Sequence, residues 1–184
     1  TALVAAVVAA GGFVRGVTGF GGAMAIAPAA SALLGPVPAI VLALSMEAAA
    51  SATMLSGALR LADRRLMGLI CVASALTTPI GGLALAYADP ALMKRAIAAT
   101  VLVSAALMAS GLRWRGSRRP AATVGVGGIA GLMVGATGFG APPVILYLLS
   151  GEEPIAVTRA NLIFYVTFMS AAGLATLIAS GLAG

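Results

Sequence analysis

Long apolar runs separated by short polar segments dominate the chain. Four runs, at residues 38–59, 66–86, 94–112 and 155–182, are each near the ~20 residues that a helix needs to cross a bilayer. Their apolar positions are continuous, whereas the strands of a membrane barrel alternate apolar and polar positions. Because backbone groups in hydrocarbon must pair within their own segment, the pattern predicts an all-α integral membrane protein, a polytopic helical bundle.

Two further runs, 1–34 and 121–149, are too long for one ordinary span and carry glycines near their middle. Each glycine weakens a helix by about 1 kcal/mol relative to alanine. We therefore expect each run to be a broken helix or a re-entrant segment, made of two half-helices that meet at the glycines. Broken helices of this kind line substrate sites in secondary transporters.

The glycines belong to a segment that occurs twice. Residues 12–21 read GFVRGVTGFG and residues 131–140 read GLMVGATGFG, so every glycine, the threonine and the following phenylalanine coincide. The next spans also align, with Pro38 matching Pro154. We infer two homologous repeats, 1–116 and 117–184, and expect the second to be cut short after its second span.

Composition and charge support the membrane assignment. Charged residues make up 9% of the chain, against about 25% in soluble domains. The net charge of +6 would suggest nucleic acid in a soluble protein. Here the basic residues cluster in loops 60–65 and 113–119 between apolar runs, and no stripe of interleaved aromatic and basic residues occurs. We expect a multi-pass protein of the bacterial inner membrane, with both loops cytoplasmic and no nucleic-acid partner.

The inventory of reactive side chains is short. The chain has no histidine and a single cysteine, Cys71, which lies inside an apolar run. Most metal sites and the commonest general base are thereby removed, so we expect no metal and no cofactor. The spans also lack paired carboxylates and a nucleophile with its base, which makes an intramembrane enzyme the least favoured interpretation.

The Thr-Gly-Phe-Gly core of each motif is the predicted substrate site. Half-helix N-termini at such a break present backbone amides and the positive end of the helix dipole to an anion. Close helix packing is the alternative explanation for the small-xxx-small pairs at 12/16 and 131/135. The candidate residues are Gly16, Thr18, Gly19, Phe20, Gly21 and Gly22 in the first copy, and Gly135, Thr137, Gly138, Phe139 and Gly140 in the second.

A few polar residues inside the spans are further candidates. Glu47 lies mid-span, where an acid is costly, so it is a candidate proton-coupling group or a structural partner of a freed backbone group. Arg15 and Arg159 are candidate cations for an anionic substrate, although either side chain can instead reach the interface. Ser45 and Asn161 occupy equivalent places in the two copies and would line a cavity or bridge helices.

At GVTGFGG (16–22) and GATGFGAPP (135–143) the chain resembles the sulfite exporter TauE/SafE family, a group of anion permeases. That family carries a GxxGxGG-type motif near the start of each of two repeats, and the likeness covers nearly the whole chain. The resemblance implies transport of sulfite, sulfonates or related sulfur-containing organic anions. The chain departs from the pattern at residues 141–143, where Ala-Pro-Pro replaces a further glycine run.

Together these features predict a secondary transporter that moves a small sulfur-containing anion, with proton coupling through Glu47 as an addition. The alternative is an anion channel that uses the same amides. Breaks within fully crossing helices would give parallel repeats, whereas re-entrant hairpins would give inverted ones. Half-helices near a dozen residues reach only the midplane and favour hairpins. The direction of transport, the coupling ion and a homo-oligomeric state stay open.

Overall fold

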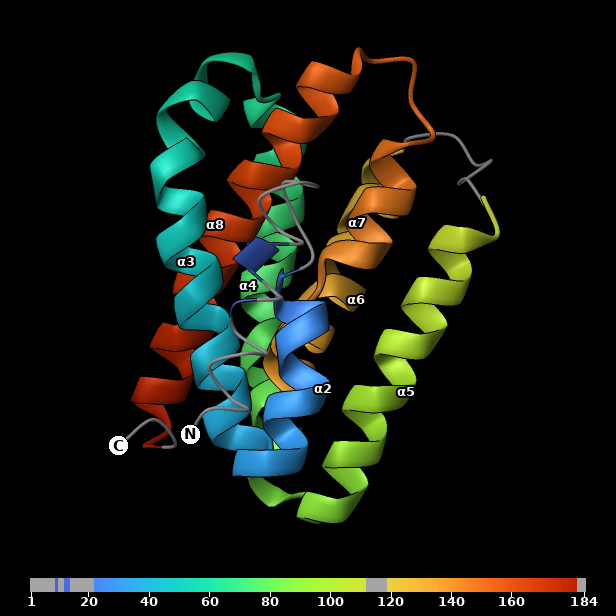
Figure 1. The fold of residues 1–184 in the computed structure, drawn as a ribbon. Helices are drawn as coiled ribbons and strands as arrows, with labels where there is room; N and C mark the ends of the chain where they lie inside the picture. Colours follow the sequence, from blue (N-terminus) through green and yellow to red (C-terminus); the bar gives the residue numbers. More distant parts are fainter. Residues whose placement is uncertain (1–8, 10–11, 14–21, 112–118, 182–184) are drawn as a thin grey trace.

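The computed structural model describes residues 9, 12–13, 22–111 and 119–181, and within these ranges it is a bundle of helices without a strand (Figure 1). Five helices in the described part are long and apolar enough to cross a membrane. The prediction of an all-α polytopic membrane protein is confirmed.

The helices follow the apolar runs closely. Those with crossing length are α3 (Pro36–Leu61), α4 (Arg64–Tyr87), α5 (Pro90–Ala109), α6 (Pro120–Thr137) and α8 (Ile155–Ala179). Two shorter apolar helices, α2 (Gly22–Leu34) and α7 (Ala141–Leu148), directly follow the two glycine motifs. Figure 1 shows that α2 and α7 start within the bundle and run toward opposite ends of it.

Turn residues set several helix boundaries. Gly35, with a φ of 93°, separates α2 from α3 in a backbone conformation that favours glycine. The Asp63 carboxylate accepts two backbone amides of the first turn of α4, each at 3.0 Å. Asp89 caps α5 in the same way at 2.8 and 3.1 Å. These caps satisfy amides that a helix start leaves unpaired.

Glycines bring α4 and α6 into the tightest contact of the bundle. Gly127, Gly131 and Gly135 lie along one face of α6 and press on the α4 backbone. A Cβ at Gly127 would lie 2.6 Å from the Ile70 carbonyl oxygen, and one at Gly131 would collide with the carbonyl oxygen of Ser74. The small-xxx-small pattern therefore works as a packing face in this helix pair.

Hydrogen bonds between the same two helices fix their register. The Ser74 hydroxyl donates to the Gly127 carbonyl at 2.7 Å, and the Thr77 hydroxyl donates to the Gly128 carbonyl at 2.8 Å. Successive turns of α4 meet successive turns of α6 in the same order, so the two helices run parallel. Both therefore begin at the end of the bundle that carries loop 60–65 (Figure 1).

The pair α3 and α8 crosses the bundle in opposite directions. Ala58, late in α3, packs with Ala160 and Ile163, early in α8. Leu44, early in α3, contacts Gly173, late in α8. These two helices follow the two glycine motifs at corresponding places in the sequence, and Figure 1 shows them antiparallel.

The second long apolar run is broken, as predicted. Helix α6 ends at Thr137, residues 138–140 turn the chain, and α7 returns along α6. The hydroxyls of Thr123, early in α6, and Tyr147, late in α7, are 2.6 Å apart, so the two helices are antiparallel. We call this unit the α6–α7 hairpin. Its arms are unequal, since α6 has 18 residues and α7 has 8.

Candidate functional site

Backbone geometry explains why glycines occupy the turn of the α6–α7 hairpin. Gly138 has a φ of 81°, and a Cβ added there would lie 2.9 Å from the Ile40 side chain. At Gly140, a Cβ would collide with the Ala130 carbonyl oxygen of the neighbouring arm. Side chains at these positions would therefore strain the backbone or push the arms apart.

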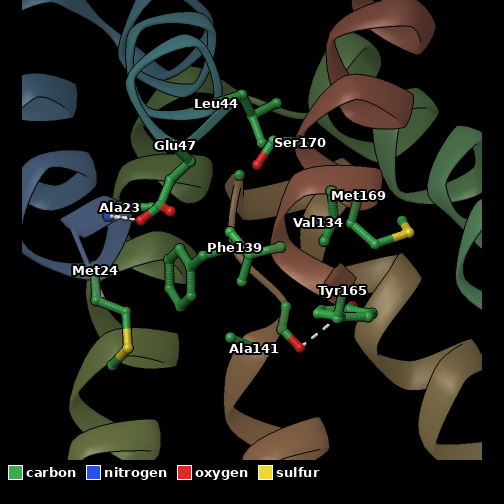
Figure 2. Close-up of a pocket in the computed structure, with 13 residues that line it drawn as sticks. Ala23, Met24, Leu44, Glu47, Val134, Phe139, Ala141, Tyr165, Met169 and Ser170 are labelled. Atoms are coloured by element: carbon green, nitrogen blue, oxygen red, sulfur yellow. Dashed lines mark hydrogen bonds between the residues drawn. The ribbon is translucent and has the colours of Figure 1, made fainter. Parts of the chain in front are cut away.

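A small cavity lies beside this turn, between α2, α3, the α6–α7 hairpin and α8. Its volume is about 30 Å³. Figure 2 shows side chains from these elements gathered around it. The lining residues are Ala23, Met24, Leu44, Glu47, Val134, Gly138, Phe139, Gly140, Ala141, Tyr165, Val166, Met169 and Ser170.

Glu47 is the acidic group of the described cavity wall. It lies on α3, is 5% exposed and accepts a hydrogen bond from the Ala23 backbone amide at 2.8 Å (Figure 2). Ala23 is the second residue of α2, so the carboxylate lies at the positive end of that helix. The N-terminus of a half-helix and the acid predicted as a proton-coupling group or structural partner therefore meet at one place.

On the other side of the cavity, two hydroxyl groups donate hydrogen bonds to backbone carbonyls near the turn. Tyr165, on α8 and 1% exposed, donates to the Gly140 carbonyl at 3.5 Å (Figure 2). The Thr137 hydroxyl donates to the Met133 carbonyl at 2.7 Å and lies 3.3 Å from the Phe139 carbonyl. Buried hydroxyl groups thus bond to backbone carbonyls before and within the turn, as buried polar groups require.

The first motif cannot be placed in this geometry. Gly22 begins α2, one residue before the amide that Glu47 accepts. The other candidates of that copy lie outside the described residues: Arg15, Gly16, Thr18, Gly19, Phe20 and Gly21.

In the second copy, the structure brings Gly138, Phe139 and Gly140 together with Glu47 on the cavity wall. Gly135 faces the other way and packs on α4, where a Cβ would lie 2.6 Å from a backbone nitrogen.

The remaining polar candidates lie elsewhere. Ser45 is exposed and donates to the Val41 carbonyl of its own helix at 2.7 Å. Asn161 is 2% exposed, and its side-chain oxygen accepts the Asp63 amide at 2.8 Å, which ties α8 to the turn before α4. Arg159 is exposed near the start of α8. Asn161 therefore bridges secondary-structure elements, one of the two roles predicted for it.

Several cavity residues have no clear signal in the sequence. Tyr165 and Ser170 are polar residues on α8, inside an apolar run whose spacing alone does not separate cavity positions from core positions. Met24 and Met169 read as ordinary core residues.

Comparison with known proteins gives one clear result. A family model described as Sulfite exporter TauE/SafE matches residues 3–184. Searches among curated proteins and among solved structures give no match.

Proposed function

Because the chain belongs to the sulfite exporter TauE/SafE family, we propose that it is a secondary transporter that moves a small sulfur-containing anion, such as sulfite or an organosulfonate, across the bacterial inner membrane. The family is one of exporters, in agreement with the prediction that the chain is not an enzyme. The observation that carries the proposal is the cavity where the turn of the α6–α7 hairpin, the N-terminus of α2 and Glu47 meet.

The substrate site we propose is this cavity, extended by the first motif. Backbone donors at the start of α2 would receive the anion, aided by the helix dipole. Helix α7 contributes less, because Pro142 and Pro143 in its first turn have no backbone N–H. The substrate would thus be held mainly from the α2 side, with Phe139 and the methionines packing against its uncharged part.

The position of Glu47 links the binding of an anion to the binding of a proton. Its carboxylate already accepts an amide at the N-terminus of α2, so it competes with an incoming anion for the same donors. Two negative charges 4 Å apart repel by about 4 kcal/mol at an effective dielectric constant of 20. A proton on Glu47 removes this repulsion and weakens the hold of its oxygen on the amide. We therefore propose that proton and anion bind together.

The size of the cavity favours a carrier over a channel. A volume of about 30 Å³ holds about two water molecules, at 10–15 Å³ for each probe-sized centre. A site of this size must widen to admit an anion of several heavy atoms. Alternating access, in which one group of helices moves relative to another around the site, supplies that opening. Saturable, gradient-driven flux would support the carrier, and an unsaturable ohmic current would support a channel.

Inverted repeats would account for the arrangement around the site. Helices α3 and α8 follow the two motifs and run antiparallel, and the second copy forms a hairpin. We propose that residues 1–34 form a corresponding hairpin of opposite orientation. We also propose that loops 60–65 and 113–119 are cytoplasmic. Arg60, Arg64, Arg65 and Arg119 lie at one end of the bundle, in keeping with the excess of positive charge on that side of membrane proteins.

Substrate flux into proteoliposomes tests the site. Gly138→Val should abolish uptake of sulfite and of an organosulfonate without preventing membrane insertion, because valine cannot adopt the φ of 81° and would contact Ile40. Gly125→Val is the matched control on the same helix, since a Cβ there meets nothing within 4 Å. Wild-type flux in Gly138→Val, or equal loss in both variants, would contradict the proposed site.

The proton-coupling role of Glu47 is tested separately. Glu47→Gln keeps the size of the side chain and an oxygen that accepts the Ala23 amide, but it cannot exchange a proton. We expect this variant to bind the anion and to lose the dependence of uptake on an imposed pH gradient. Unchanged pH-dependent uptake would assign Glu47 a structural role, while the transport function itself would stand. Side-by-side binding of sulfite, sulfonates and simple carboxylates to the purified protein would identify the preferred substrate.

A further inference from the structure

A groove runs along the outer face of the α4–α6 pair and shares no lining residue with the cavity. Its volume is about 660 Å³. One end carries a cation, and the rest of the described wall is apolar. The residues that matter for its chemistry are Arg65, Leu69, Val72, Leu76, Pro120 and Val124.

The apolar wall faces outward and follows the helix axis. Val72 and Leu76 are 59% and 72% exposed, and Leu69 and Val124 are 40% and 46% exposed. Residues three and four apart share one face of a helix, so the α4 members form a continuous strip below Arg65. Lipid chains are the surroundings that such a strip meets in a membrane.

The cationic end of the groove lies at the start of α4. Arg65 is exposed and is the second residue of that helix, and Arg60, Arg64 and Arg119 are exposed near the same end. The acidic residues of the described chain at this end are Asp63, whose carboxylate accepts two amides of the first turn of α4, and Glu152 and Glu153 in the loop before α8. None of these carboxylates lines the groove, whose described wall carries the cation of Arg65, and a guanidinium there suits a phosphate group.

The length of the groove matches one leaflet of a bilayer. From Arg65 to Leu76 the helix rises ~16 Å at 1.5 Å per residue. Half of a ~30 Å hydrocarbon core is ~15 Å. A cation at the headgroup level with an apolar strip beneath it, ending near the midplane, has the dimensions of one phospholipid molecule.

We propose that this groove binds an anionic phospholipid of the leaflet next to the basic loops, with its phosphate at Arg65 and an acyl chain along Leu69, Val72 and Leu76. Basic pockets between membrane helices bind anionic headgroups in this way. The proposal is independent of the substrate site, because the two share no residue.

Native mass spectrometry of the purified full chain tests the proposal, with phosphatidylglycerol or phosphatidylcholine added. Wild type should retain phosphatidylglycerol in preference. Arg65→Gln should weaken its binding about fivefold, since one basic residue near a membrane surface is worth about 1 kcal/mol. Lys94→Gln, which removes an exposed cation of α5 at the opposite end of the bundle, should leave binding unchanged.

A second pair of variants tests the apolar strip. Val72→Trp fills the groove without altering charge and should lower retention of both lipids, whereas Leu102→Trp, on the exposed face of α5, should not. The proposal would be overturned if Arg65→Gln and Lys94→Gln lost phosphatidylglycerol binding equally. It would also be overturned if Val72→Trp bound phosphatidylglycerol as well as wild type does. Displacement of the lipid by millimolar inorganic phosphate would identify a free-anion site instead, and a bound second copy of the chain would identify an oligomer interface.

Discussion

Replacing Gly131 by alanine puts a methyl group into the α4–α6 contact, where no space exists for it. The Cβ would collide with the Ser74 carbonyl oxygen and the Thr77 hydroxyl, and it would lie 2.6 Å from the Ser74 Cα. Backbone atoms cannot move aside as the end of a flexible side chain can, so the helices must separate. A separation of at least about 0.8 Å is needed, since that distance restores an ordinary contact of 3.4 Å to the Cα, the most distant of the three atoms.

The energetic consequence follows from the same geometry. The separation would stretch the two interhelical hydrogen bonds from 2.7 and 2.8 Å to about 3.5 Å, where a hydrogen bond contributes little. Such bonds average about 0.6 kcal/mol each in a membrane. Overpacking adds about 1–3 kcal/mol, and the helix preference of alanine offsets about 1 kcal/mol. We expect Gly131→Ala to lower the free energy of unfolding by about 1–3 kcal/mol.

The chain supplies its own probe for this measurement. Cys71 is its single cysteine and is buried on α4, so a thiol-reactive dye reports thermal unfolding in detergent. Gly125→Ala is the matched control, because a Cβ there meets nothing within 4 Å and alanine should stabilise the helix by up to about 1 kcal/mol. A melting temperature of Gly131→Ala equal to that of wild type, or an equal decrease in Gly125→Ala, would refute the reasoning.

Three other contacts give further predictions, and the same melting assay checks each. Asn161→Ala should cost about 1–3 kcal/mol, because it orphans a backbone amide before α4, whereas Ser45→Ala should be neutral, since that exposed hydroxyl bonds only within its own helix turn. Tyr147→Phe should cost about 1 kcal/mol by removing the contact to Thr123 that fastens the α6–α7 hairpin. Asp89→Ala should cost about 1 kcal/mol through loss of the α5 cap.

Each of these expectations has a result that would contradict it. Equal melting temperatures for Asn161→Ala and Ser45→Ala would mean that the buried amide finds another acceptor. Tyr147→Phe at wild-type stability would mean that the hydroxyl pair does not fasten the hairpin. An unchanged melting temperature for Asp89→Ala would mean that the proline at the first position of α5 sets the helix start by itself.

Hydropathy predicts the spans of this fold well, because lipid selects apolar residues wherever a helix crosses. The glycine cluster at 135–140 also predicts the second break, since glycine is the residue that a positive φ at position 138 favours. What the residues could not reveal is which glycine serves which purpose. Gly135 and Gly138 belong to one motif, yet the first packs on α4 and the second lies on the cavity wall.

Tertiary contacts also decide the roles of the polar residues. Ser45 and Asn161 are equivalent in the sequence alignment, but one is exposed and the other bonds a backbone amide that is distant along the chain. Glu47 could be singled out as a buried acid, although its partner could not, because the Ala23 amide becomes available only where α2 happens to start. The inward-facing hydroxyls of α8 depend on a helix rotation that apolar spacing does not determine.

The union of α4 and α6 has a consequence for how the protein moves. These helices belong to different copies of the inferred duplication, yet close backbone contact and two interhelical hydrogen bonds join them into one rigid unit. A movement that opens the cavity would carry α4 and α6 together or leave both in place. A chimera that exchanges residues 117–184 for those of another protein would therefore have to rebuild the tight α4–α6 contact.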